Sequence, residues 1–172
     1  MKAESVPGRV RLIDYDRYTP SFNAPAGFIA TPVFSGRRFV GVLAAQVSID
    51  AVNQLMNRGG KWREEGLGKS GETYVVGSDR TMRSNSRFMI EKPEALEARL
   101  REAGVSPVTL IRTMERRDTV FEVGVDTPGV DAAIKGLTGQ DVFDDYRGVR
   151  VLSAYRPVDV PDLDWVLMAE ID

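Results

Sequence analysis

The sequence predicts an α+β fold in which an antiparallel sheet is flanked by helices. Its β-rich runs follow one another across turn-sized gaps, which favours hairpins and therefore an antiparallel sheet. Segments with helical periodicity lie together in the middle of the chain, between the strands, so we expect the helices to cover one face of that sheet. The chain has 172 residues, of which 42% are hydrophobic and 28% are charged, a composition typical of a globular protein with a core.

The N-terminal third predicts a hairpin followed by a short helix. About the first 25 residues show no period, and we expect a loop or a short edge strand there. The runs 28–34 and 39–48 are β-rich, and the gap 35–38 contains a glycine and has the length of a turn. Asp50 then suits the N-cap of a helix that ends near Gly59.

Beyond a glycine-rich, charged linker at 61–71, the chain alternates between blocks of strands and blocks of helices. Strands are predicted at 72–76, 81–86, 118–125, 140–146, 149–158 and 165–171. Helices are predicted at 93–104, from Ser106-Pro107 onward and after Thr127-Pro128, each with a proline in its first turn. The last three strands form a predicted meander, with Arg147-Gly148 as one of its turns.

The apolar stripes of the helices predict which side chains enter the core. The first helix is expected to bury one face, and the third carries a stripe with helical spacing. The expected inward side chains are Leu96, Leu100, Ala103, Ile111, Met114, Val130, Ala133, Ile134 and Leu137. Leu163 and Trp165 are also expected in the core, and Trp62 is expected to pin the linker.

The composition excludes several classes of site. The chain has no cysteine and no histidine, which removes disulfides, thiol nucleophiles and the usual ligands of haem, zinc and copper. We therefore expect neither a metal nor a cofactor. A formal charge of −2 gives no reason to expect nucleic acid as a partner. No apolar run approaches the roughly 20 residues of a membrane helix, and no signal peptide follows Met1. We interpret the sequence as a soluble piece from which any anchor and secretion signal have been removed.

The residues for catalysis are also missing. The adjacent pairs Glu64-Glu65 and Asp144-Asp145 do not make acid–base dyads, because neighbours on a strand face opposite ways. No nucleophile elbow is present. The sequence therefore predicts no catalytic residues and no enzyme.

Gly66, Gly68 and Gly71 spell the pattern G-x-G-x-x-G of dinucleotide-binding loops. Such a loop must follow a strand and open a helix, so that backbone amides and the helix dipole meet a phosphate. Here the glycines precede a predicted strand, which favours a structural linker.

Polar residues concentrate near the predicted strand 81–86 and suggest a first candidate binding site. On a strand, Arg83, Asn85 and Arg87 share one face. Two guanidinium groups on a concave face can clamp a carboxylate or a phosphate. The alternative is a solvated face of an edge strand.

A second candidate site combines Asp145 and Tyr146 with Tyr155 on the next strand. Asp145 can hold a ligand ammonium while a tyrosine packs beside it. Pairing about the Arg147-Gly148 turn is expected to bring Asp145 close to Arg150. A hairpin salt bridge with core tyrosines is the alternative interpretation.

A sequence pattern that occurs twice in the chain suggests two related modules. Both 32–50 and 157–172 run from Pro-Val through a turn and an apolar strand to Ile-Asp. Chance is an alternative explanation, because apolar strands of this kind are common. If the repeated pattern reflects two modules, the first module is too short to be complete.

Three groups of segments resemble the Cache family of extracytoplasmic sensor domains. The first group resembles the end of a membrane-distal module and consists of Tyr18-Thr19-Pro20-Ser21, Pro25, 28–34 and 41–44. The second group resembles the opening of a membrane-proximal module and consists of Trp62, 66–77, Met82-Arg83-Ser84 and Ser86-Arg87-Phe88. The third group resembles the end of that proximal module and consists of Asp145-Tyr146-Arg147-Gly148, 151–155 and Leu163-Asp164-Trp165. In combination the chain is similar to the double-Cache, PAS-like ectodomains of bacterial adenylate/guanylate cyclases and of some chemotaxis receptors and histidine kinases.

This resemblance implies a division into two modules. Residues 1–60 are expected to be the remnant of a truncated distal module with its connecting helix, and 61–172 the complete proximal module. Such ectodomains bind small metabolites in a PAS-like pocket and dimerise along a long N-terminal helix, which this sequence lacks. The amino-acid-binding signature of one Cache subfamily is also missing. We add Tyr74, on the strand that opens the proximal module, to the candidate ligand-binding residues.

The resulting hypothesis is an extracytoplasmic, periplasmic sensor of a carboxylate- or amine-bearing small molecule. It would belong to a membrane-anchored, homodimeric bacterial receptor with a nucleotide cyclase as effector. A chemoreceptor or histidine kinase sensor is an alternative parent. The alternative from another class is a ligand-free spacer or dimerisation module.

Overall fold

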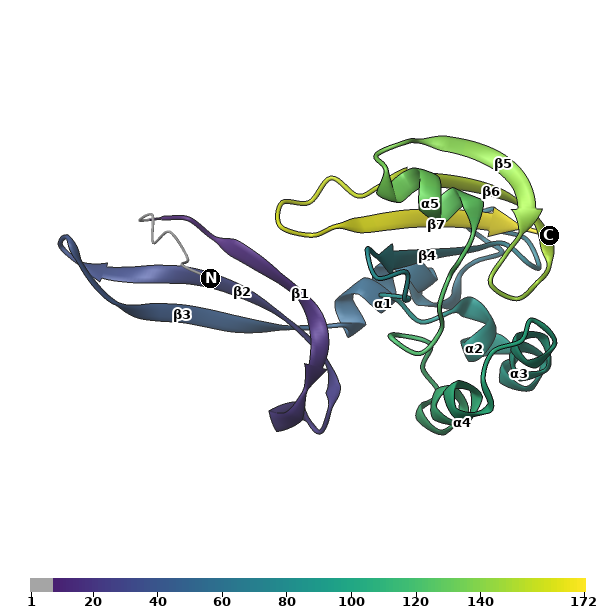
Figure 1. Cartoon of the computed structure of the whole chain (residues 1–172), viewed down its shortest axis with the longest axis horizontal. Coiled ribbons are helices and arrows are strands. Elements are labelled where there is room, and N and C mark those ends of the chain that lie inside the picture. The colour runs from purple at the N-terminus through teal and green to yellow at the C-terminus, as the bar shows by residue number, and fades with distance from the viewer. Residues whose placement is uncertain (1–7) are drawn as a thin grey trace. The chain divides into compact units, whose positions relative to one another are not determined.

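The computed structural model describes residues 8–172, which divide into two compact units (Figure 1). Unit 1 contains the chain up to Ala51 together with Asp159–Leu163, and unit 2 contains Val52–Val158 and Asp164–Asp172. This division falls earlier than the predicted boundary at 60/61. The reason is that the helix after Ser48 bonds to unit 2, where the backbone carbonyl of Met56 accepts a hydrogen bond from Thr73. The assignment of the units to Cache modules stays a prediction.

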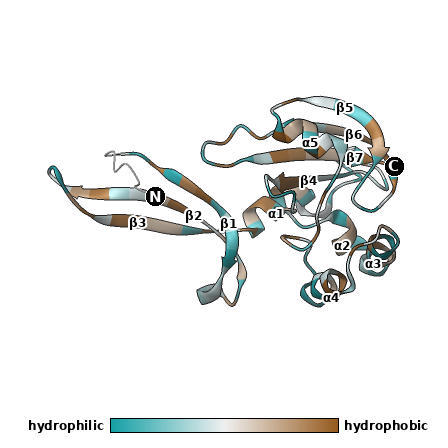
Figure 2. Cartoon of the chain, viewed as in Figure 1, coloured by the Kyte–Doolittle hydropathy of each residue, from teal (hydrophilic) through white to brown (hydrophobic). Residues whose placement is uncertain are grey.

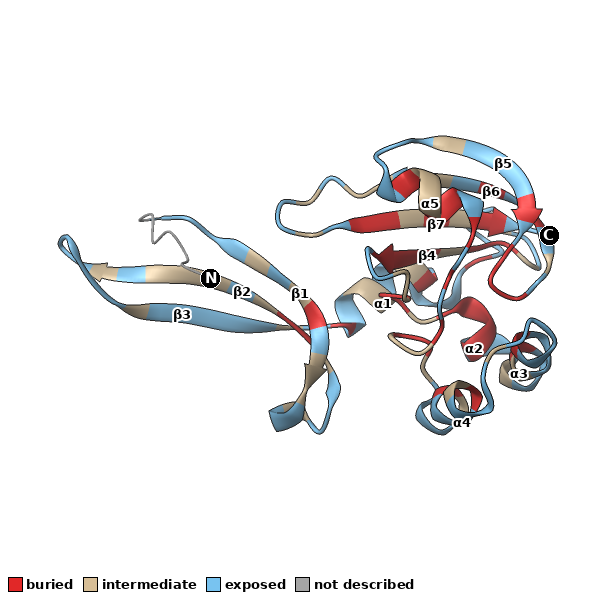
Figure 3. Ribbon diagram, viewed as in Figure 1, coloured by how far each residue is buried: buried red, intermediate tan, exposed pale blue. Residues whose placement is uncertain are grey.

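Unit 1 is a three-stranded antiparallel sheet with the order β1-β2-β3. Its strands are β1 (Arg11–Tyr18), β2 (Ala24–Ser35) and β3 (Arg38–Ser48), and a 3-10 turn, η1 (Thr19–Ser21), joins the first two. The predicted hairpin is present, and β1 is the expected edge strand. Hydrophobic residues occur along all three strands, yet few are buried (Figures 2 and 3). Val42 and Leu43 of β3 are both more than 60% exposed.

Unit 2 contains a four-stranded antiparallel sheet with the order β4-β7-β6-β5. The strands are β4 (Glu72–Gly77), β5 (Gly139–Asp144), β6 (Arg150–Pro157) and β7 (Trp165–Ile171). The predicted meander of the last three strands is confirmed. The strand β7 lies between β4 and β6 and pairs with both.

The helices of unit 2 begin where the sequence supplies prolines and caps. They are α1 (Asp50–Asn57), η2 (Arg58–Gly60), α2 (Arg87–Glu91), α3 (Pro93–Glu102), α4 (Pro107–Arg116) and α5 (Pro128–Ile134). Ser106 and Thr127 cap α4 and α5 by accepting hydrogen bonds from the third backbone amide that follows them. Helix α5 contacts β5, β6 and β7, so it covers the sheet, while α3 packs against α2 and α4 (Figure 1).

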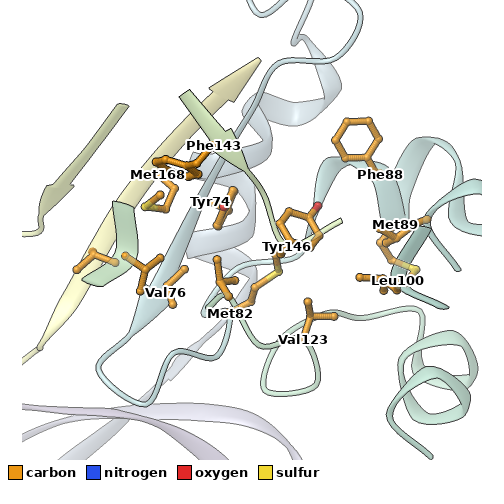
Figure 4. Close-up of a cluster of buried hydrophobic side chains, with 14 of the residues drawn as sticks. Tyr74, Val76, Met82, Phe88, Met89, Leu100, Val123, Phe143, Tyr146 and Met168 are labelled. Atoms are coloured by element: carbon orange, nitrogen blue, oxygen red, sulfur yellow. The ribbon is translucent and has the colours of Figure 1, made fainter. Parts of the chain in front are cut away.

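The core of unit 2 fills the space between the sheet and the helices (Figure 4). Alternate residues of β4 and β7 point into it, because side chains of a strand alternate between its faces. The members labelled in Figure 4 are Tyr74, Val76, Met82, Phe88, Met89, Leu100, Val123, Phe143, Tyr146 and Met168. The core includes most of the predicted helix positions: Leu96, Leu100, Val130 and Ala133 are buried, and Met114 packs against the cluster.

Two predicted strands are wrong. Residues 81–86 and 118–125 form only isolated bridges, Val76 with Met82 and Thr81 with Gly124. Met82 and Arg83 still donate their backbone N–H groups to the carbonyls of Val123 and Val75. In the second half of the segment side chains replace a partner strand, since Asn53 accepts from Asn85 N–H and Thr119 accepts from Ser86 N–H. Side-chain partners of this kind satisfy the backbone without a ladder.

Four predicted core positions are exposed: Ala103, which is the C-cap of α3, and three residues with larger side chains. Ile111 and Leu137 are each 58% exposed and Ile134 is 40% exposed. Helix α4 packs on α3 rather than on the sheet, so Leu110 and Thr113 are its buried residues. Ile111 lies instead on a groove of about 440 Å³ between α3 and α4, whose floor includes Leu110.

The close approach of α5 to the sheet generates a test. A methyl group on Gly129 would lie 2.6 Å from the Phe143 ring and 2.9 Å from the Tyr155 ring. We therefore expect Gly129→Ala to destabilise unit 2 by about 1–3 kcal/mol, although alanine usually favours a helix by about 1 kcal/mol. Urea unfolding followed by tryptophan fluorescence measures this, because both tryptophans belong to unit 2. Gly124→Ala is the control, since a methyl there meets nothing within 4 Å. Equal stability of the two variants would contradict the packing of α5.

Candidate ligand site

A row of polar residues crosses the buried face of the unit 2 sheet. Glu72 of β4 and Glu170 of β7 are direct partners across the strand pair, and Ser153 of β6 is the next partner of Glu170. Only 1% of the Glu72 surface and 3% of the Glu170 surface are exposed. Within residues 8–172 neither carboxyl group is in a salt bridge with an arginine or a lysine. Two acidic groups therefore lie side by side in the core.

Hydroxyl groups surround both carboxyls. Tyr74 Oη donates to Glu170 Oε2 over 2.8 Å, and Ser153 Oγ donates to Glu170 Oε1 over 3.0 Å. Tyr146 Oη lies 2.6 Å from Glu72 Oε1, and Ser86 Oγ lies 3.0 Å from Glu72 Oε2. The rings of Tyr74 and Tyr146 meet edge to face with centroids 5.5 Å apart, within the core shown in Figure 4.

Glu72 also joins the sheet to helix α2. Its Oε2 accepts a hydrogen bond from the backbone N–H of Arg87 over 3.1 Å. Ser86 is the N-cap of α2, and its Oγ accepts from Phe88 N–H. The start of α2 is therefore fixed to β4 through one carboxyl group.

Burial dominates the electrostatics of the cluster. It raises the pKa of Glu72 to about 7, although the hydrogen bond from Tyr146 and the charge of Arg147 act in the opposite direction. Burial likewise raises the pKa of Glu170 to about 7, against the hydrogen bond from Tyr74. The pKa values of both tyrosines are raised, first by burial and then by the neighbouring carboxylates. The site therefore disfavours negative charge.

Asp145 is engaged by Arg147 rather than by Arg150. Arg147 Nε donates to Asp145 Oδ2 over 2.6 Å, and Arg147 Nη2 donates to Asp172 Oδ1 over 2.7 Å. The guanidinium also lies 3.9 Å above the Phe88 ring. The expected proximity of Asp145 to Arg150 is wrong, because the register of β5 and β6 places Asp144 opposite Arg150.

Arg83 and Arg87 do not face a common site. The Arg83 guanidinium makes two 3.0 Å bonds to the Asp79 carboxylate and passes directly over Gly77, where a Cβ atom would lie 2.5 Å from it. Arg87 is the first residue of α2, so the strand alternation that predicted a shared face does not reach it. The geometry of the predicted clamp is therefore wrong.

Arg87 instead fixes the glycine-rich loop. Its guanidinium donates to the carbonyls of Gly71 over 2.5 Å and Gly68 over 3.1 Å, and it stacks on Trp62 at 4.9 Å. The loop precedes β4, and its carbonyls rather than its amides face the arginine. This is the structural linker that the sequence favoured.

The remaining candidates lie apart from the acidic pair. Asn85 joins two loops, since its Nδ2 donates to Arg117 O and its Oδ1 accepts from Thr119 N–H. Tyr155 is half-buried and packs against the core beside Gly129 and Gly139. Of the seven predicted ligand-binding residues, the structure thus brings Tyr74 and Tyr146 together at the acidic pair. Ligand binding by the seven stays a prediction.

Sequence reasoning missed Glu72, Ser86, Ser153 and Glu170. A signal for the two acids was present, because each occupies an inward position of a strand that is otherwise apolar on that face. An acid at such a position is rarely buried without a partner or a function. Residues 8–172 hold no group of three acidic side chains arranged for a metal ion. They also hold no helix long and apolar enough to cross a membrane.

Comparisons with known proteins find similarity in structure alone. No protein-family model and no curated protein matches the chain. The ligand-binding domain of the Pseudomonas aeruginosa amino acid chemoreceptor PctC, in complex with GABA, matches with a TM-score of 0.54 at 13% identity. That match covers 95% of this chain and 56% of the other. The fold is that of Cache-type, PAS-like sensor domains.

Two further structures support this assignment of the fold. The ligand-binding domain of the Pseudomonas fluorescens chemoreceptor CtaA, in complex with L-serine, matches 99% of this chain and 57% of its own at 15% identity, with a TM-score of 0.52. The extracellular domain of mmHK1S-Z3, described as a histidine kinase, matches 95% of this chain and 49% of its own at 14% identity, with a TM-score of 0.51. The chain spans about half the length of these domains. The predicted α+β fold is confirmed, and the link to nucleotide cyclases stays a prediction.

The role of Arg87 generates a test. We expect Arg87→Met to destabilise unit 2 by about 2–4 kcal/mol, because the buried carbonyls of the glycine-rich loop lose their donor. Tryptophan-monitored urea unfolding measures the change. The control is Arg99→Ala, whose arginine and its partner Glu102 are both more than half exposed, so that it should cost less than about 0.5 kcal/mol. A stable Arg87→Met variant would show that the guanidinium is available for a ligand.

Proposed function

We propose that the chain is part of the extracytoplasmic sensor of a bacterial transmembrane receptor, and that unit 2 responds to a small molecule. The observation that supports this most is the shared Cache-type fold, which extends over 95% or more of the chain. The proposed location is the periplasm, and the proposed assembly in the whole receptor is a membrane-anchored homodimer. The chain itself is proposed to catalyse no reaction.

The proposed ligand bears an amine. A bound ammonium group beside Glu72 and Glu170 would stabilise the ionised form of their carboxyls, and the tyrosine hydroxyls next to them offer hydrogen bonds. The ligands of the two similar chemoreceptor domains, GABA and L-serine, both carry an amine. A carboxylate clamp is less favoured, because the guanidinium groups of Arg83 and Arg87 are bonded to protein groups.

The sheet offers a route from such a site to the rest of a receptor. Glu170 belongs to β7, which pairs with β4 on one side and β6 on the other. A ligand that favours one arrangement of Glu170 therefore biases the position of the central strand. We propose a nucleotide cyclase as effector from the sequence resemblance, with a chemoreceptor or kinase as the alternative that the solved structures favour.

A ligand-free spacer is the second candidate. The observation that favours it is the space under the sheet, which protein side chains fill (Figure 4). In a spacer, the acidic pair would contribute only to the packing of the sheet against α2.

A thermal-shift screen of the 172-residue chain separates the two functions. We expect amines and amino acids to raise the unfolding temperature, and matched carboxylates without an amine to leave it unchanged. A ligand present at about 100 times its Kd stabilises the folded state by about 2.7 kcal/mol. Glu170→Gln should abolish the shift by removing the charge, whereas the exposed Glu102→Gln should retain it. The absence of any shift would favour the spacer, and a shift with carboxylates alone would contradict the amine site.

A further inference from the structure

Three groups in the core of unit 2 form a closed ring of oxygen contacts. Tyr146 Oη lies 2.6 Å from Glu72 Oε1, Ser86 Oγ lies 3.0 Å from Glu72 Oε2, and Ser86 Oγ lies 2.7 Å from Tyr146 Oη. All three distances are hydrogen-bond distances between oxygens. Each side of the ring therefore requires one proton.

An ionised Glu72 leaves this ring one proton short. A carboxylate only accepts, so the two hydroxyls would supply two protons for three contacts. Two oxygens would then face each other at hydrogen-bond distance with no proton between them. A protonated Glu72 supplies the third proton, and the ring closes with Glu72 donating to Tyr146, Tyr146 to Ser86 and Ser86 to Glu72. The additional hydrogen bonds from Arg87 N–H to Glu72 and from Phe88 N–H to Ser86 remain compatible with this arrangement.

The charged neighbours of Glu72 leave it without a paired cation. Glu170 is its direct partner on β7, and like charges at such positions destabilise a strand pair. On the β5–β6 turn, Arg147 is engaged by Asp145 and Asp172. The Arg87 side chain of α2 is directed to the loop carbonyls and to Glu91. The other titratable neighbours, Tyr74 and Tyr146, are themselves hydrogen-bonded to the acidic pair.

We propose that Glu72 is a proton-operated switch, protonated when its ring with Ser86 and Tyr146 is closed and opening that ring when it ionises. Opening separates the N-cap of α2 from the β5–β6 turn, because the contact between Ser86 and Tyr146 loses its proton. The joint between the sheet and the helices of unit 2 then loosens. The protein thus responds to pH as well as to any small molecule that it binds.

The direction of the pH dependence follows from the raised pKa. Glu72 has a pKa of about 7 in the folded unit, against 4.5 for an ordinary glutamate. The protonated ring therefore stabilises unit 2 fully below about pH 4.5, and this stabilisation is lost as the pH rises through about 7. Between about pH 5 and about pH 8.5 the unfolding equilibrium constant is expected to rise by roughly 50- to 100-fold from this group.

The experiment uses the whole chain without any ligand. The carboxyl carbon of Glu72, in carbon-13-labelled protein, should titrate with a midpoint near 7, and exposed glutamates should titrate at about 4.5. In Glu72→Gln the amide replaces the protonated carboxyl as donor, so the rise in the unfolding constant with pH should shrink by about tenfold or more. The exposed Glu102→Gln should leave the rise unchanged. A Glu72 midpoint below 5, or an unchanged rise in Glu72→Gln, would overturn the proposal.

A second variant keeps the test valid if Glu72→Gln does not fold. Tyr146→Phe removes the acceptor of the Glu72 proton and the oxygen that faces Ser86, so the Glu72 midpoint should fall. If Tyr146 were only a donor to a carboxylate, its removal would raise the midpoint. A raised midpoint in Tyr146→Phe would therefore overturn the ring. Because no ligand enters these measurements, their outcome is independent of the proposed amine binding.

Discussion

The buried carboxyl of Glu72 is the interaction on which the arrangement of unit 2 depends. It lies on the first strand of the sheet and contacts Tyr146 in the turn after β5 and two residues at the start of α2. These partners are far apart in the sequence, and each is buried. If the carboxyl were absent, a tyrosine hydroxyl, a serine hydroxyl and a backbone amide would each lose a partner at a buried position. One side chain thus holds the sheet, a helix and a hairpin turn together.

Because of the same carboxyl group, the inner face of the sheet is apolar at one end and acidic at the other. At one end of β4 and β7, Val76 pairs with Val166, and at the other end Glu72 pairs with Glu170. The apolar end gains stability from burial, whereas the acidic end can be buried only while its charge is removed or balanced. The proposed proton switch at the acidic end would leave the apolar packing at the other end in place. This property fits the proposed sensing function, in which two arrangements must differ by little free energy.

The sequence predicted those elements of the fold whose signals are local. The strand 165–171 was predicted with the residues that the structure shows, and the helix at 93–104 is α3. The strand predicted at 81–86 was wrong, because the side chains of Asn53 and Thr119 bind the backbone amides of its second half in place of a neighbouring strand. Ile111 was wrongly assigned to the core, because periodicity defines an apolar face but does not say that α4 would turn that face partly toward a groove beside α3.

The candidate site was less predictable than the fold for the same reason. Arg83, Arg87 and Asp145 were chosen for their charge. In the structure Arg83 binds Asp79, Arg87 binds loop carbonyls, and Asp145 binds Arg147. The groups that converge, Glu72, Ser86, Tyr146 and Glu170, come from four separate segments. No local pattern joins them, since only the register of β4 with β7 places the two acids opposite each other.

The sequence by itself determined that the chain is an α+β protein without histidine or cysteine chemistry, because composition and periodicity are properties of the chain alone. It also determined where most helices begin, since prolines and capping residues act within one turn. Only the tertiary structure decided which polar side chains are partners and how many protons they share. Hydrogen bonds depend on distances of a few tenths of an ångström between groups that the sequence keeps far apart.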